Sequence, residues 1–104
     1  MNKMFQDFRK IGQGVEVSAD SVPHIAFIDQ DTMLNVMKHN GTGWVQVGNP
    51  AFAKAMELDM EFAPNGDIYV VFRDITGLSI AQGATSLMLY NPTIGGNWAY
   101  AVGG

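Results

Sequence analysis

The stretch Met56–Asp74, which reads MELDMEFAPNGDIYVVFRD, decides the fold. Apolar and acidic side chains alternate strictly over Met56–Phe62, and a period of two residues is typical of a half-buried β-strand. Pro64–Asp67 then has the chemistry of a turn, because proline sets φ and the following asparagine and glycine tolerate positive φ. A run of β-branched and aromatic residues follows at Ile68–Phe72. The stretch therefore predicts a β-hairpin.

A shorter counterpart of this hairpin occurs earlier in the chain, so the sequence contains an internal repeat. Four pairs of segments match in the same order: Val15–Ala19 with Leu58–Phe62, Pro23–Asp29 with Ile68–Asp74, Val36–Asn40 with Leu87–Asn91, and Trp44–Gly48 with Trp98–Gly103. The offset between matched residues grows from 43 to 54 along the chain, which indicates insertions in loops, since loops tolerate changes of length. We place these insertions at Asn65-Gly66, within Ile75–Ser86 and at Pro92–Gly95.

Each repeat is expected to form four strands. In the first repeat these lie near Val15–Ala19, His24–Ile28, Leu34–His39 and Trp44–Val47, and in the second near Met56–Phe62, Ile68–Phe72, Thr85–Tyr90 and Trp98–Val102. One alternative is helical: Ala51–Met60 has high helix propensity, and a short helical turn could form at Ala51–Lys54. From Met56 onward, the two-residue alternation and the matching strand at Val15 favour a strand.

The composition fits a small folded domain and argues against several classes of partner. The chain has 104 residues, of which 47% are hydrophobic and 15% are charged, as expected for one globular domain. The net charge of −4 argues against a nucleic-acid partner, which calls for a basic face. The absence of cysteine excludes disulfides and thiolate metal sites. No apolar run approaches the roughly 18 residues that span a bilayer, so we expect no membrane partner.

The repeat resembles the blade of a β-propeller, because it has four strands, spans about 40–50 residues and closes on an aromatic residue and glycine. The segments PHIAFID and IYVVFRD, followed by VMKHNGTGWVQVG and LMLYNPTIGGNWAYAVGG, resemble the repeats of a group of bacterial, often secreted, propellers. Those repeats run roughly as Pro-Tyr-Val-Ala-Tyr-x-Asp, Val-Met-Lys-Tyr-x-Gly and Trp-x-x-Val-Gly. The resemblance implies an extracellular or cell-surface location, although the first residues lack the apolar segment of a signal peptide.

The fold class that this resemblance implies is all-β and β-propeller-like, as a single unit over residues 1–104. It would consist of a partial N-terminal blade at 1–12 and two four-stranded antiparallel blades at 13–48 and 49–104. A propeller closes with about 4–8 blades, and because repeats bury their core against neighbouring repeats, about three or more copies are needed. We therefore expect either self-association into a homo-oligomer, in which three chains would supply six blades, or a fragment of a larger propeller.

Two recurring sets of residues are candidates for a ligand site. The first contains Trp44 and Trp98, with Asn40 and Asn97 beside them, and an indole ring there could be a platform for a sugar. The alternative is that the two tryptophans fill the space between blades, and their recurrence at one repeat position favours it. The second set is Asp29 and Asp74, which could accept ligand hydroxyls or bind Ca²⁺, or could cap the turn that follows; capping is favoured.

The remaining polar residues predict no catalytic or metal site. Glu57, Asp59 and Glu61 form an acidic ladder, which is a cation site, a docking face for a basic partner or the solvated face of a strand; the solvated face is favoured. His24 and His39 could form a metal-binding pair, but they lie on different strands, nothing in the sequence places them together, and no metal site is favoured. No nucleophile or acid–base motif is visible, so we expect neither an enzyme nor a cofactor. The sequence thus predicts a non-catalytic binding module for glycans or a surface polymer, or alternatively a structural element that self-assembles through blade edges.

Overall fold

The computed structural model describes residues 13–17, 21–75 and 84–102, so the predicted partial blade at 1–12 lies outside the described residues. The described residues form eight strands: β1 (Gln13–Val17), β2 (Pro23–Ile28), β3 (Met33–His39), β4 (Trp44–Gln46), β5 (Ala53–Phe62), β6 (Ile68–Asp74), β7 (Ala84–Tyr90) and β8 (Ala99–Val102). The predicted all-β class is confirmed. The helical alternative at Ala51–Lys54 is wrong, because Ala51 adopts a φ of 50° and β5 begins two residues later.

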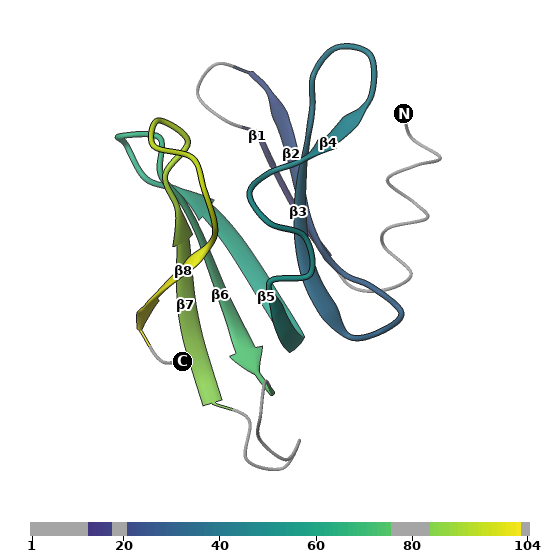
Figure 1. The fold of residues 1–104 in the computed structure, drawn as a ribbon, viewed down its shortest axis with the longest axis vertical. Helices are drawn as coiled ribbons and strands as arrows, with labels where there is room; N and C mark the ends of the chain where they lie inside the picture. The colour runs from purple at the N-terminus through teal and green to yellow at the C-terminus, as the bar shows by residue number, and fades with distance from the viewer. Residues whose placement is uncertain (1–12, 18–20, 76–83, 103–104) are drawn as a thin grey trace.

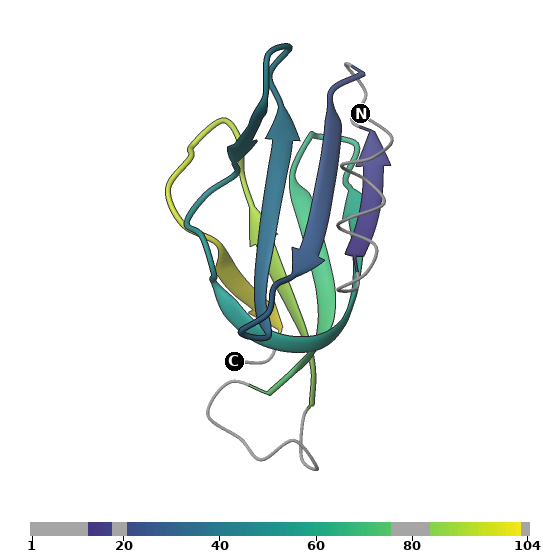
Figure 2. The same ribbon diagram turned by 90° about the vertical axis from the view of Figure 1, so that its right-hand side faces the viewer.

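All strand pairs are antiparallel, and they form one open sheet whose path runs β1-β2-β3-β5-β6-β7-β8, with β4 paired to β3. The link between β3 and β5 is short, since only Met33 with Lys54 and Leu34 with Ala53 are paired. The sheet therefore folds into two layers, which Figure 1 shows side by side and Figure 2 shows one in front of the other. We call β1–β4 the first layer and β5–β8 the second layer.

The two layers repeat the same strand register. In the first layer His24 is paired with Lys38, and in the second layer their predicted counterparts Tyr69 and Leu89 are paired in the same way. The same equivalence holds at the next position, where Val45 lies opposite Lys38 and Ala99 lies opposite Leu89. The internal repeat that the sequence predicts is thus present in the backbone pairing of strands two to four of each layer.

The predicted match between the first strands of the two layers, β1 and β5, is wrong by two residues. Val15 is paired with Ile25, and Met60 is paired with Val70, the counterpart of Ile25. Val15 is therefore equivalent to Met60 and not to Leu58. The offset is 45 residues for both pairs, so the predicted insertion in the β5–β6 turn does not exist. A shift of two residues keeps every side chain on the same face, which is why the sequence pattern alone did not reveal it.

The hydrophobic core lies between the two layers. It combines fully buried residues from both of them, such as Ala26 and Val36 in the first layer and Met60 and Val70 in the second. The predicted hairpin turn closes one end of the second layer, where the Gly66 amide donates to the Ala63 carbonyl at 2.9 Å and glycine supplies a φ of 92°.

Candidate functional site

Trp98 lies in the core at the junction between the layers and is only 5% exposed. Its indole Nε1 donates to the carbonyl of Val47 at 2.8 Å, and its backbone amide donates to Oδ1 of Asn49 at 2.8 Å. The ring of Phe52 stacks on it, with centroids 4.6 Å apart and planes 8° apart. These contacts join the end of the second layer to the end of the first. Trp98 therefore packs between the layers and presents no exposed ring to a sugar.

Trp44, the counterpart of Trp98, is half-buried and meets the ring of His39 edge-on at 5.2 Å. Asn40 caps the turn before it: its Oδ1 accepts from the backbone amides of Thr42 and Gly43, both at 3.0 Å. Asn97, by contrast, is exposed. The two tryptophans of the predicted glycan site therefore differ in their surroundings. Trp98 is buried, whereas Trp44 is half-buried and follows a turn that Asn40 caps.

The capping role on the second layer belongs to a residue that the sequence analysis did not select. Asn91 is the counterpart of Asn40, and its Oδ1 accepts from the amides of Thr93 at 2.9 Å and Ile94 at 3.2 Å. The signal was available, because both asparagines end a matched segment and precede glycine-containing loops.

Asp29 and Asp74 occupy equivalent positions but have different partners. Oδ1 of Asp29 accepts from the amides of Asp31 at 2.9 Å and Met33 at 3.0 Å, while Oδ2 accepts from the Asn35 amide group at 3.1 Å. Asp29 is therefore a turn cap, the favoured alternative. Asp74 is buried, and the Tyr100 hydroxyl donates to it at 2.7 Å, which ties β8 to β6 across β7.

The acidic ladder lies on the exposed side of β5, and Glu57 forms a loose ion pair with Arg73 at 3.7 Å. Within the described residues, no group of three or more histidine, aspartate or glutamate side chains could hold a metal ion. His24 is paired with Lys38, the neighbour of His39, and adjacent residues of a strand point to opposite faces. The two histidines therefore lie on opposite faces of the first layer.

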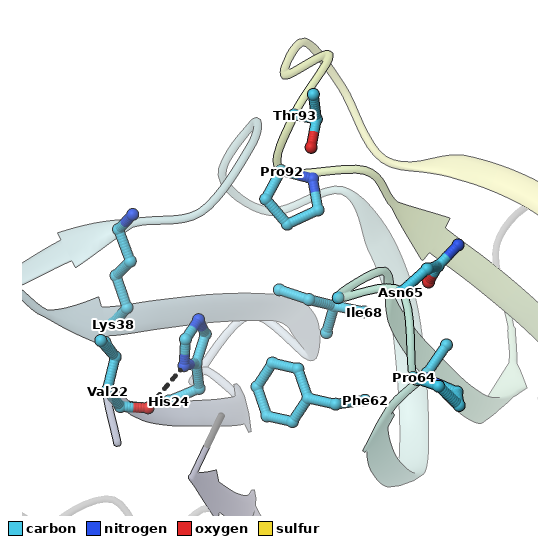
Figure 3. Close-up of a pocket in the computed structure, with 11 residues that line it drawn as sticks. Val22, His24, Lys38, Phe62, Pro64, Asn65, Ile68, Pro92 and Thr93 are labelled. Atoms are coloured by element: carbon cyan, nitrogen blue, oxygen red, sulfur yellow. Dashed lines mark hydrogen bonds between the residues drawn. The ribbon is translucent and has the colours of Figure 1, made fainter. Parts of the chain in front are cut away.

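A pocket of about 640 Å³ opens where the two layers meet, at the end that carries the β5–β6 turn. Figure 3 shows its walls, which come from the start of β2 and the end of β3 on one side and from the second layer on the other. We call it the seam pocket; its lining residues are Val22, His24, Lys38, Phe62, Ala63, Pro64, Asn65, Gly66, Ile68, Pro92 and Thr93. None of the predicted site residues belongs to this lining.

His24 forms the buried side of the seam pocket. It is 6% exposed, its Nδ1 lies 3.0 Å from the Val22 carbonyl, and its ring meets Phe62 edge-on at 4.8 Å. From the sequence, His24 was a candidate only for a metal-binding pair with His39. Its proximity to Lys38 and Phe62 depends on strand register and on the packing of the layers, which no local motif reports.

A second surface is the outer face of the second layer, which we define by Tyr69, Val71, Leu87, Leu89 and Val102. These residues share one face because they are cross-strand neighbours on β6, β7 and β8. Val71 is 37% exposed and Val102 is 61% exposed, and the other three are partly buried. In the first layer, the equivalent face packs on the second layer.

A scan against protein-family models finds no match, and a search of curated proteins finds no relative of this chain. Among the residues that the structure describes, no helix has the length and apolar character needed to cross a membrane.

Proposed function

We propose that this chain is a non-catalytic binding module of the β-propeller type, with the outer face of the second layer as its binding surface. In this proposal each layer is a blade, and the outer face binds a further blade. The proposal is supported by one observation above all: the outer face of the second layer is the repeat equivalent of the face that the first layer buries.

The equivalence is clearest at two positions. Ala26 and Val36 are neighbours across β2 and β3, and both are fully buried against the second layer. Their counterparts Val71 and Leu87 are neighbours across β6 and β7 and are partly exposed. A repeat unit buries its faces against neighbouring units, so an uncovered face of this type calls for a third layer. Covering Val71 and Val102 alone would contribute about 1–3 kcal/mol.

The occupant of this face is either a second copy of the chain or the rest of a larger propeller. In the existing junction the second layer contributes Val70 and Phe72, whose first-layer counterparts are Ile25 and Phe27. Ile25 and Phe27 are already buried in the chain, at 0% and 8% exposure. The face of the first layer that carries Ile25 and Phe27 is therefore not open to the outer face of another copy. A second copy would instead cover the outer face with its own outer face, as a two-fold dimer. A larger propeller would supply a new blade.

The oligomeric mass in solution tests the self-association. We expect a mass of two chains by light scattering at micromolar concentration, and of one chain in the double variant Val71→Lys, Val102→Lys. Both valines are already exposed, so these changes leave the core intact. Ile94→Lys is the matched control, because Ile94 is 81% exposed in the β7–β8 loop. A wild-type mass of one chain at every concentration would refute self-association.

Glycan binding is a second proposal, now restricted to the surroundings of Trp44. The half-buried ring and the exposed Thr42 beside the Asn40 cap support it, because an indole and hydroxyl groups are the usual partners of a sugar. An NMR titration with neutral oligosaccharides tests it: amide shifts at 40–46 that disappear in Trp44→Ala would support binding there. Shifts that persist in that variant would refute this location.

A further inference from the structure

We propose that the seam pocket binds a small organic anion that carries one carboxylate group on an apolar body. The pocket lies between the layers and not on the outer face, so this proposal does not depend on what covers that face. It rests on three properties of the lining: its volume, its apolar walls and the position of Lys38.

The volume and the walls suit an apolar body of small-molecule size. Ligand pockets typically measure about 300–1,000 Å³, and the seam pocket has about 640 Å³. Phe62, Ile68 and Pro92 line the pocket from the second layer, and His24 and Lys38 line it from the first, as Figure 3 shows. The edge-on contact of His24 with Phe62 fixes the orientation of both rings. An aromatic or aliphatic group can therefore lie against Phe62 and Ile68 without displacing charged side chains.

Lys38 supplies the charge that selects an anion. Figure 3 shows its side chain at the edge of the pocket beside His24, and it forms no ion pair with any carboxylate whose side chain the structure describes. Among the described residues, the lining contains no aspartate or glutamate, although the whole chain has a net charge of −4. The pocket is thus locally cationic on an acidic protein. A carboxylate near the Lys38 ammonium would gain a charge-assisted hydrogen bond while the rest of the ligand lies on Phe62.

The site is specific to this junction and is not a general property of the repeat. The counterparts of His24 and Lys38 in the second layer are Tyr69 and Leu89. A further layer packed on the outer face would therefore form a junction without the lysine and the histidine. The repeat is broken at the two positions that give the seam pocket its polar character.

The test is a titration of the whole chain with three probes, followed by amide chemical shifts: 3-phenylpropionate, its neutral amide and propionate. We expect 3-phenylpropionate to shift the amides of Val22, His24 and Thr93 with a dissociation constant near the millimolar range. The neutral amide and propionate should bind at least about fivefold more weakly, because each lacks one of the two recognised groups.

Two variants assign the charge recognition to Lys38. Lys38→Gln should weaken 3-phenylpropionate about fivefold, and Lys38→Arg should retain most of the affinity. Lys54→Gln is the matched control, since it removes the same charge from the start of β5, outside the pocket lining. Lys38 is exposed, so its replacement leaves the fold unchanged. Absence of shifts at about 10 mM probe, equal binding of the neutral amide, or unchanged affinity in Lys38→Gln would each overturn the proposal.

Discussion

Trp98 should stabilise the fold far more than its repeat counterpart Trp44, and this difference tests the two-layer packing directly. Replacing Trp98 by phenylalanine keeps an aromatic ring between the layers but removes the indole N–H. The carbonyl of Val47, which accepts that hydrogen bond at 2.8 Å, then loses a buried partner. Part of the stack on Phe52, at 4.6 Å, is also lost because the smaller ring covers less of it.

The expected magnitude follows from these two losses. A buried acceptor left without its donor costs about 1–3 kcal/mol, and the reduced ring area adds about 1 kcal/mol. Trp98→Phe should therefore lower the free energy of unfolding by about 2–4 kcal/mol. Trp98→Ala should cost about 3–5 kcal/mol, which is a large part of the roughly 5–15 kcal/mol that stabilises a typical domain. Trp44→Phe, the same change at the half-buried counterpart, should cost less than about 1 kcal/mol.

The assay is urea unfolding followed by circular dichroism, with all three variants measured under one condition. Fluorescence gives an independent reading, because the chain has two tryptophans and Trp44→Phe leaves Trp98 alone. We expect the emission of Trp98 to be blue-shifted and poorly quenched by acrylamide, and that of Trp44 to be quenched more strongly. If Trp44→Phe cost as much stability as Trp98→Phe, or if Trp98 were the more accessible ring, the packing described here would be wrong.

Two further substitutions probe the turns that hold the layers. Gly48→Ala should destabilise by about 1–3 kcal/mol, because Gly48 has a φ of 73° and an added Cβ would lie 2.7 Å from Cδ1 of Trp98; a thermal unfolding midpoint unchanged from wild type would contradict this. Asp29→Ala should lower the free energy of unfolding in urea by about 1–3 kcal/mol, because three hydrogen bonds to its carboxylate are lost. Asp31→Ala, at the exposed neighbour, should change it by less than about 0.5 kcal/mol, and equal effects of the two would refute the capping role.

Much of the backbone architecture was readable from local patterns. The alternation over Met56–Phe62 and the turn after it predicted a hairpin that the structure contains, and the matched segments predicted the common register of the later strands. These predictions succeeded because strand periodicity and turn chemistry act between residues that are close in the chain. They failed by two residues at β1, since a shift of one full period changes neither the faces nor the pattern.

Tertiary structure alone decided what the equivalent residues do. Trp44 and Trp98 have the same place in the repeat, yet only Trp98 is buried between the layers, because only it has Val47 and Phe52 against it. In the same way, nothing in the sequence around His24 and Lys38 indicates a pocket. They line one because the β5–β6 turn lies on its other side. The sequence determined the repeating unit through short-range periodicity, whereas contacts between the units, which join residues far apart in the chain, decided which copies became core, cap or pocket.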